Sequence, residues 1–529
     1  MRRTTPYGLA CAQCRTGKRR CLGQAGAICP GCLKRGVHCS NAVTRNTSAT
    51  LHSILPAAGQ SNGGSPTDVL AQLQPSIIAE LVELYIDFIH DKPHSLFHVP
   101  SLRANVVDHT IEKSLLCSIL ALSVRFSSHG SVRSLGDKLA LQARQLLKAE
   151  LEEITISKIQ AWILLGNVAG STADSSSEAL YFGLAIRCAQ IIGLPAVEPG
   201  DTAVNRETKS RIWWTLYMID RWASAGLGIP RQMGERQPSQ QLPFDEWALH
   251  GLPIQQAEWL TVPQPGMWAY MITLAELFGS IHDMNKLLAV HGVDPAETQT
   301  SVETLSNALE DWQRGLPESL RLSHETLELH RQRDQGRTFV ALHLGYYHYR
   351  TLLFFQLLDQ SAVDLQHAAQ HAQSCRDAAS AFSDLLRSSY ATPGCEAMYV
   401  IVGHMAVVCS SVLIHILLFG QEEELPTARR RLESNFGILL KLRSWWPSNE
   451  GMTARLFLFQ NMCIRSVGNH FRFDRWMAKF ILEHAITLDD KTEMERLHAT
   501  SPESVESPEA PDLRQIMIGD GLRRLHYRC

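Results

Sequence analysis

The chain has 529 residues, of which 45% are hydrophobic and 19% charged, and its formal net charge is −3. This average excludes a wholly disordered, a collagen-like or a polytopic membrane protein, and the length exceeds the roughly 250–300 residues at which a single core stops growing. The charge is unevenly placed, because residues 1–67 contain nine Lys and Arg and no Asp or Glu. Subtracting these nine from the total of 50 leaves 41 basic against 53 acidic side chains in residues 68–529, a net charge of −12.

The first predicted element is a cysteine repeat in residues 11–39. Six of the 13 cysteines follow the spacing C-x2-C-x6-C-x7-C-x2-C-x6-C, and shifting the first three by 18 residues gives the other three. They are Cys11, Cys14, Cys21, Cys29, Cys32 and Cys39. The start of the chain has polar residues after Met1-Arg2-Arg3 and lacks the apolar run of a secretion signal, so disulfides are the weaker interpretation and metal binding is the stronger one.

The number of thiols indicates how metal would be bound. Each half of the repeat supplies three thiolates, whereas a structural zinc takes four tetrahedral ligands. Six sulfurs can serve two zinc ions only if two of them bridge both ions, and the repeat suggests one bridging sulfur from each half, such as Cys11 with Cys29. A single-zinc finger built from the two CxxC pairs would leave the third cysteine of each half unused. We therefore expect two Zn²⁺ per chain, and folding of the segment coupled to metal binding.

This segment resembles the fungal binuclear zinc-cluster transcription factors. The resemblance is carried by the whole cysteine spacing, by Cys14-Arg15-x-x-Lys18-x-x-Cys21 and by Lys34-Arg35-Gly36 before the last cysteine. It implies two short helices around two zinc ions, the first of which enters the DNA major groove and reads a CGG-type triplet through Lys18. The chemistry agrees, since guanine offers O6 and N7 as acceptors in the major groove and the Lys ammonium is a donor.

The other basic residues of the cluster are expected at DNA phosphates, where they position the module and make affinity fall with salt. They are Arg15, Arg19, Arg20, Lys34 and Arg35. A lone basic residue is usually only a solvated surface charge, but nine without an acidic neighbour favour nucleic acid. Gly17 departs from the family pattern, which usually has a basic or bulky residue there, and it weakens a helical turn.

Residues 40–75 are rich in Ser, Thr, Asn, Gly and Pro and are predicted to be a flexible linker. Members of the family often dimerise through a coiled coil here. Leu51, Ile54 and Leu55 begin a turn of such a pattern, but Pro56 ends it well short of three heptads. Dimerisation is therefore assigned to the domain that follows.

Residues 76–490 are predicted to form a large all-α domain, called the α-domain below. Ser76 is expected to cap a helix in which apolar residues recur every three or four positions up to Phe88. Further helical periodicity occupies 111–127, 137–152, 156–170, 176–193 and 207–223, and no run shows the alternation of β-strands.

Several pieces of the α-domain resemble the middle regulatory region of the same family, best over residues 76–245. They are residues 84–102, 114–128, 179–195 and 207–231. In the family this region restrains or transmits the activating signal, sometimes by sensing metabolites. From the residues alone, residues 207–231 are predicted to pack in the core of the α-domain, with Asp220 in an ion pair with Arg211 or Arg221.

Two segments in the second half required a choice between interpretations. Residues 397–420 contain no Asp, Glu, Lys or Arg and are long enough to span a bilayer, but polar residues interrupt them and no basic cluster flanks them. A buried helix of the α-domain is predicted, and no association with a membrane is expected.

His367 and His371 are four residues apart, a spacing that could bind a metal on a helix. Ala368 stands where a zinc protease has its Glu base, so two ordinary histidines are predicted and no enzyme is expected.

Residues 491–529 form an acidic, Pro- and Ser-rich tail that is predicted to be disordered. The whole pattern predicts a nuclear transcription factor that binds CGG-containing double-stranded DNA and acts on the RNA polymerase II machinery or co-regulators. It would dimerise, if at all, through the α-domain, and would control a metabolic or secondary-metabolite gene set. The alternative is a zinc-dependent co-regulator that acts mainly through protein partners.

Overall fold

The structure is a computed structural model that describes residues 68–92, 94–237, 239–259, 264–291, 295–358, 368–465, 473–489 and 491. The chain divides into two units, residues 1–67 and 68–529, and every described residue belongs to the second. The predicted linker up to residue 67 and the predicted tail from residue 492 lie outside the described residues. The predicted end of the linker at residue 75 is wrong, because Val69 and Leu70 are buried in the core of the second unit, a 3₁₀ helix occupies Leu70–Gln72 and the first long helix begins at Pro75.

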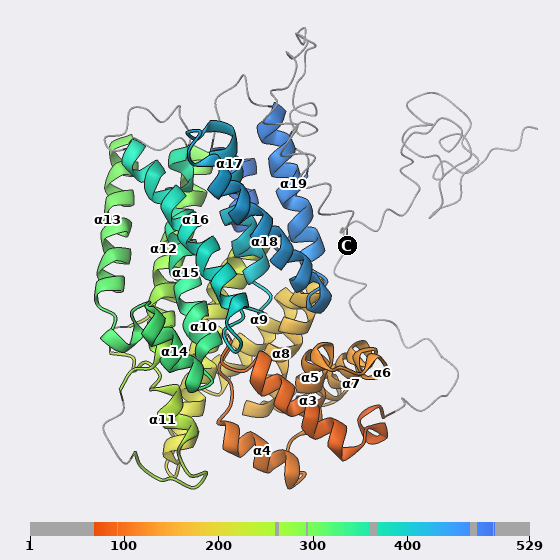
Figure 1. Cartoon of the computed structure of the whole chain (residues 1–529). Helices are drawn as coiled ribbons and strands as arrows, with labels where there is room; N and C mark the ends of the chain where they lie inside the picture. Colours follow the sequence, from red (N-terminus) through yellow and green to blue (C-terminus); the bar gives the residue numbers. More distant parts are fainter. Residues whose placement is uncertain are drawn as a thin grey trace, which may run out of the picture. The chain divides into compact units, whose positions relative to one another are not determined.

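The described part is built from helices (Figure 1). Its first half contains α3 (Pro75–Phe88), α4 (Val99–Val107), α5 (Lys113–Ser123), α6 (Gly130–Arg133), α7 (Gly136–Ala149), α8 (Ile156–Ser171), α9 (Ser175–Ile191) and α10 (Ala203–Leu227). Its second half contains α11 (Glu246–His250), α12 (Met267–His291), α13 (Pro295–Arg314), α14 (His324–Gln332), α15 (Gly336–Phe354), α16 (Ala368–Ala391), α17 (Val402–Phe419), α18 (Leu425–Trp445), α19 (Asn449–Arg465) and α20 (Arg475–Leu482). Short 3₁₀ helices occupy Leu70–Gln72, Val124–Phe126, Glu318–Leu320 and Phe355–Leu358.

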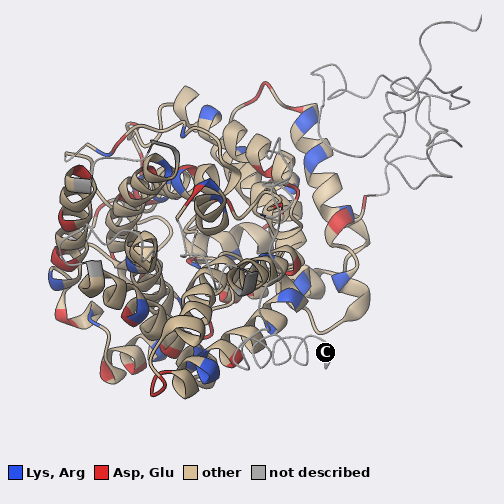
Figure 2. Cartoon of the chain, turned by 90° about the horizontal axis from the view of Figure 1, so that it is seen from above, with Lys and Arg blue, Asp and Glu red and all other residues tan. Residues whose placement is uncertain are grey.

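The all-α prediction is confirmed. Among the described residues the only β-type pairings are two isolated bridges, His90 with His94 and Phe244 with Pro265. Helices adjacent in the chain pack together, notably α8 with α9, α15 with α16 and α17 with α18, as expected for consecutive helices of an all-α domain (Figure 1). One continuous hydrophobic core runs from α3 to α20. Lys, Arg, Asp and Glu are interspersed over the helices, without a band of one sign (Figure 2).

The predicted start of the first long helix is wrong in one respect. The helix begins at Pro75, after Gln74 in extended conformation, and no side chain caps it. Proline is favoured at the first helical position because its missing N–H would have no partner there. Ser76 therefore lies inside the first turn, whereas Thr155, Asp174 and Thr202 do cap α8, α9 and α10 through side-chain oxygens.

The uncharged segment 397–420 is a buried helix, as predicted, although the helix itself begins only at Val402. Of the described helices, α17 is the one long and apolar enough to span a membrane, yet 89% of it is buried inside the structure. Its polar residues have partners within the core: the Asn435 side chain of α18 donates hydrogen bonds to Ser410 Oγ at 3.1 Å and to Ser383 Oγ of α16 at 3.0 Å. Through Ser410, which interrupts the apolar run, Asn435 thus links α16, α17 and α18.

Candidate functional site

The predicted metal ligands and DNA contacts all lie in residues 11–39, outside the described residues. They are Cys11, Cys14, Cys21, Cys29, Cys32 and Cys39 for zinc, and Lys18, Arg15, Arg19, Arg20, Lys34 and Arg35 for DNA. Their geometry is therefore untested, and they stay predictions. Within the α-domain, the most concentrated polar cluster lies where α3 ends and meets α11.

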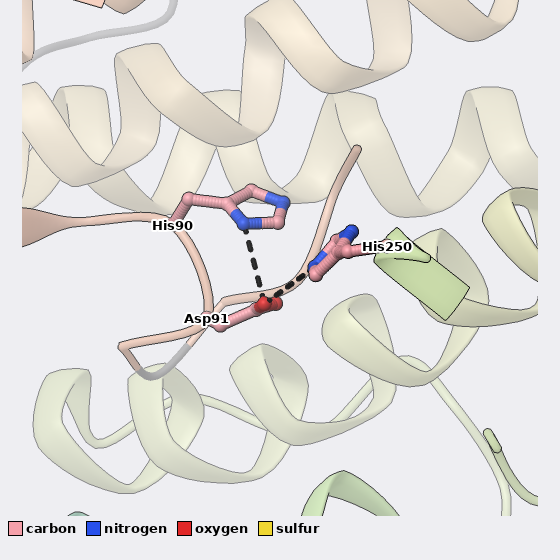
Figure 3. Close-up of side chains that lie close together, drawn as sticks. All are labelled: His90, Asp91 and His250. Carbon is pink, nitrogen blue, oxygen red and sulfur yellow. Dashed lines mark hydrogen bonds and ion pairs between the residues drawn. The ribbon is translucent and has the colours of Figure 1, made fainter. Parts of the chain in front are cut away.

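Three side chains form the centre of that cluster: His90 and Asp91, just after α3, and His250 at the end of α11 (Figure 3). His250 Nε2 lies 3.0 Å and His90 Nδ1 lies 3.4 Å from the same oxygen, Asp91 Oδ2. Burial lowers the pKa of His90. Burial also opposes the ionisation of Asp91, but the two imidazoles prevail and hold its pKa well below the usual range.

Two imidazole nitrogens and a carboxylate oxygen within 4.8 Å of one another would suit a metal ion. The hydrogen bonds of the opposite ring nitrogens argue against one. The Phe97 amide donates to His90 Nε2 at 3.0 Å, and the Val99 amide donates to His250 Nδ1 at 3.4 Å. Each ring therefore carries its proton on the nitrogen that faces Asp91, whereas a metal ligand must have that nitrogen free. The residues fit a hydrogen-bonded triad and do not fit a metal site.

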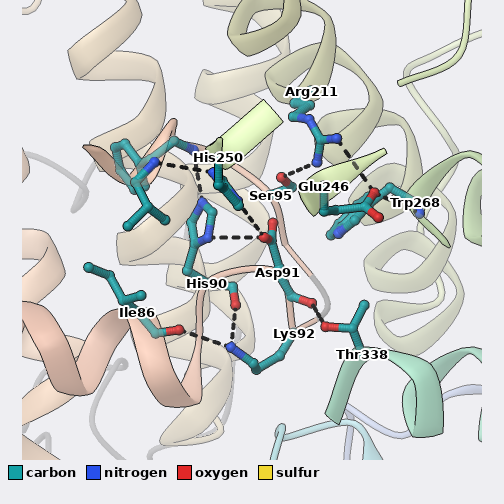
Figure 4. Close-up of polar contacts among 12 residues, drawn as sticks. Ile86, His90, Asp91, Lys92, Ser95, Arg211, Glu246, His250, Trp268 and Thr338 are labelled. Atoms are coloured by element: carbon teal, nitrogen blue, oxygen red, sulfur yellow. Dashed lines mark hydrogen bonds and ion pairs between the residues drawn. The ribbon is translucent and has the colours of Figure 1, made fainter. Parts of the chain in front are cut away.

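The surrounding contacts show that the triad fixes a loop (Figure 4). Asp91 has a φ of 59°, in the left-handed region that favours glycine, and its carbonyl accepts a hydrogen bond from Thr338 Oγ1 of α15 at 2.8 Å. The Lys92 ammonium donates to the carbonyls of Ile86 and His90, both at 2.9 Å, which completes the C-terminal end of α3. Burial lowers the pKa of Lys92 to about 8.

A second buried network lies beside the triad and is centred on Arg211 of α10 (Figure 4). Its Nε donates to Glu207 Oε1 at 2.9 Å and its Nη1 to Ser95 Oγ at 2.9 Å, while Glu246 Oε1 lies 3.5 Å from Nη2. Glu246 in turn accepts hydrogen bonds from the backbone amides of residues 267 and 268 at the start of α12. Burial raises the pKa of Glu246 to about 7, although Arg211 opposes that rise. The network ties α10, α11, α12 and the loop after α3 together.

The predicted ion pair of Asp220 is wrong. Its carboxylate accepts hydrogen bonds from the amides of Gln232 and Met233, each at 2.8 Å, and so holds the loop that follows α10. Arg221 pairs instead with Glu235 at 2.8 Å, and its guanidinium lies 3.4 Å from the centre of the Tyr217 ring. The prediction failed because a loop can place backbone donors beside a carboxylate, and the spacing along a helix does not reveal them.

The arrangement in the described residues is structural. In both networks the side chains bond to one another and to backbone groups of neighbouring segments, as structural networks do. His371 of α16 stacks on Phe354 with ring centres 5.4 Å apart, and His367 lies outside the described residues. Sequence reasoning missed the triad because His90 and His250 are 160 residues apart; the only local signal was the polar run after the apolar positions of α3.

Comparison with known proteins gives two matching family models. Residues 9–48 match the fungal Zn(2)-Cys(6) binuclear cluster domain and residues 82–314 match the fungal specific transcription factor domain. The second match extends beyond residue 245, where the resemblance was expected to fade.

Curated relatives are similar over longer stretches. An uncharacterized transcriptional regulatory protein of Schizosaccharomyces pombe is 26% identical over 324 residues, which cover 54% of this chain and 33% of the relative. The Zn(2)-C6 fungal-type transcription factors FTF1c and FTF2 of Fusarium oxysporum f. sp. lycopersici are 24% and 25% identical over 414 residues, which cover 69% of this chain and 43% and 38% of the relatives. The chain thus spans less than half the length of these relatives.

Proposed function

Because the chain belongs to the fungal Zn(2)-Cys(6) transcription factors, with the cluster domain followed by the fungal specific transcription factor domain, we propose that it is a sequence-specific DNA-binding regulator of RNA polymerase II transcription. The observation that carries the proposal is the six-cysteine repeat inside a segment with nine basic and no acidic residues. The matching domains and relatives are those of transcriptional regulators and not of enzymes.

The zinc-binding part of the proposal rests on the chemistry of the donors. A cluster domain of this kind binds zinc. Six thiolates satisfy the eight ligand positions of two tetrahedral ions if two sulfurs are shared, one from each half of the repeat, such as Cys11 and Cys29. Zinc supplies structure and no reaction here: it cross-links a segment too small to bury a core of its own.

The proposed DNA contacts follow from the family pattern and from charge. Lys18 would donate to guanine acceptors in a CGG triplet, and Arg15, Arg19, Arg20, Lys34 and Arg35 would contact phosphates. The net −12 of residues 68–529 supports this division, since an acidic body is repelled by DNA and leaves recognition to the basic segment.

We assign residues 11–39 to DNA binding, 40–67 to a linker, 68–490 to regulation and 491–529 to a tail that contacts co-regulators. The factor would act in the nucleus, on CGG-containing promoters of a metabolic or secondary-metabolite gene set. Any homodimer would form through the α-domain, since the linker lacks three heptads.

Fluorescence anisotropy with the zinc-loaded full chain tests the specificity. We expect tighter binding to a CGG duplex than to a scrambled duplex, with a steep loss of affinity as salt rises. Lys18→Ala should remove about 1–3 kcal/mol of discrimination. The matched control, Arg2→Ala, lies outside the cysteine repeat and should leave discrimination intact. Equal affinity of the wild-type chain for both duplexes would contradict the proposal.

Zinc content tests the ligand assignment separately. Mass spectrometry of the metals in the purified full chain should give about two Zn per chain, and Cys14→Ser should lower that number. His90→Gln should leave it unchanged, because the ring protons of the triad occupy the positions that a metal would need. A loss of zinc in His90→Gln would contradict the structural interpretation of the triad.

A further inference from the structure

The α-domain contains a cavity, called the central cavity below, between α10, α12, α15, α17 and α20. Its wall includes the aromatic side chains of Trp222, Phe278 and Tyr349 and the backbone of Gly345. The centre of a water molecule can occupy about 40 Å³ of it. This volume counts only the positions of the water centre, so the void itself is larger and has room for several waters or for one small ring.

The wall is apolar but contains uncharged polar groups. None of the residues that line it is Asp, Glu, Lys or Arg. Three histidines contribute: His404 stacks on His484 with ring centres 4.4 Å apart and lies edge-on to His348 at 5.5 Å. Burial lowers the pKa of each of them, which keeps the imidazoles neutral near pH 7. A charged guest would lose its hydration and find no opposite charge among the residues that line the cavity.

Two polar atoms in this wall lack a hydrogen-bond partner among the described residues. They are the hydroxyl of Tyr399, whose side chain is 5% exposed, and Nδ1 of His348, which is 3% exposed. Buried polar atoms are normally paired, so each unpaired one requires an explanation. By contrast, Tyr349 in the same wall accepts a hydrogen bond from Trp222 Nε1 at 2.7 Å.

The last described segment closes one side of the cavity. His484 packs so closely on α10 that a Cβ built on Gly226 would lie 2.4 Å from its ring, and the amide of Ala485 donates to the Gly226 carbonyl at 3.0 Å. The cavity therefore lies between helices from the beginning and the end of the α-domain, and anything bound there would contact both.

We propose that the central cavity is a binding site for a small, uncharged, mostly apolar ligand of about one ring that carries a hydroxyl or similar hydrogen-bonding group. The aromatic wall takes the ring, and the hydroxyl pairs with the unpaired Tyr399 hydroxyl and His348 Nδ1. Such a ligand stabilises the packing of α10 against α20 by binding only the folded chain. The site goes beyond the DNA-binding function and does not depend on it.

The test uses the full chain with 4-fluorophenol as the ligand and ¹⁹F NMR as the readout. We expect 4-fluorophenol to bind with a dissociation constant in the millimolar range or below and to raise the thermal midpoint by a few degrees. The anion 4-fluorobenzoate should do neither, and its neutral isostere 4-fluorobenzamide controls for its larger size. Absence of binding by 4-fluorophenol, or equal binding of the anion, would overturn the proposal.

Matched glycine variants locate the site. In Gly345→Ala the new methyl would enter the cavity and meet nothing closer than Leu274 Cδ2 at 3.6 Å, so the chain should fold and its affinity for 4-fluorophenol should fall about tenfold. Gly437→Ala, in α18, places its methyl where no atom lies within 4 Å and should bind as the wild type does. Equal affinity of both variants would mean that the ligand binds elsewhere and would refute the assignment. Tyr399→Phe should weaken binding of 4-fluorophenol more than binding of fluorobenzene, whereas a hydroxyl without a role would affect both alike.

Discussion

Acidification below pH 6.5 is expected to unfold the α-domain, because many of its histidines are buried as neutral imidazoles. Burial lowers the pKa of six of them from 6.5 to about 4 or about 3; they are His94, His98, His343, His348, His415 and His484. Below pH 6.5 the unfolded chain binds more protons at these sites than the folded chain. The free energy of unfolding therefore falls between pH 6.5 and about 4.

Carboxyl groups with a raised pKa act in the opposite direction; burial also raises the pKa of Asp220, but from a lower starting value, so Glu178 and Glu246 matter most above pH 5. Burial raises the pKa of Glu178 and of Glu246 to about 7, so the folded chain holds protons there that the unfolded chain releases down to pH 4.5. Six histidines bind additional protons on unfolding and two carboxyls release them, so the unfolded chain binds up to about four more protons than the folded chain. The effect of each group approaches about 1.4 kcal/mol per pH unit only well below pH 6.5, so the first unit below 6.5 removes roughly 3–4 kcal/mol. Typical domains have only about 5–15 kcal/mol in total.

Tryptophan fluorescence in urea, measured from pH 7.5 to pH 5, tests this reasoning. All 11 tryptophans lie in residues 68–529, so loss of zinc from the basic segment does not contribute directly to the signal. The midpoint should drop steeply below pH 6.5. His343 Nε2 lies 3.0 Å from the Leu320 carbonyl, and in His343→Gln the side-chain amide can still donate to that carbonyl. The variant lacks one buried imidazole, so its urea midpoint should fall less steeply with pH, by the contribution of about one histidine. The exposed His129→Gln is the matched control. A midpoint that is constant down to pH 5 would refute the reasoning.

Two further variants test packing and buried charge in the α-domain. Arg211→Leu should lower the free energy of unfolding by about 3–5 kcal/mol in urea titrations, because it leaves two buried carboxyl groups without their cation. Arg206→Ala, whose partner carboxylate is 77% exposed, should cost less than about 1 kcal/mol, and equal costs for the two would contradict the account. Gly403→Ala places a Cβ 1.6 Å from Asn449 Oδ1 and should cost about 1–3 kcal/mol in the same assay. In Gly437→Ala the added Cβ has no atom within 4 Å, so the free energy of unfolding should be unchanged or higher by up to ~1 kcal/mol.

The sequence predicted the helical elements well where apolar periodicity is strong. The segment 156–170 corresponds to α8 (Ile156–Ser171), and the uncharged segment 397–420 contains the buried α17. Periodicity works here because each helix must bury one face against a neighbour. Periodicity does not show how the loop after α10 folds back on the helix, so the sequence did not reveal that the backbone amides of Gln232 and Met233 donate to Asp220.

The sites within the α-domain were beyond sequence reasoning for a physical reason. The triad joins His90 to His250, and the central cavity joins Trp222 to His484, so both depend on how distant helices pack. A metal site could be predicted in the basic segment because six cysteines lie within 29 residues at a repeated spacing, and metal chemistry restricts what such a spacing can mean.

A genome-wide occupancy map of the full chain, made in its own cells with the wild type and with Lys18→Ala, tests the central claim most directly. The account predicts that wild-type peaks centre on CGG triplets in promoters and that Lys18→Ala, with zinc content unchanged, loses these peaks. Peaks without CGG enrichment that persist in Lys18→Ala, and vanish only when a partner protein is deleted, would contradict it and favour a co-regulator that reaches DNA through other proteins.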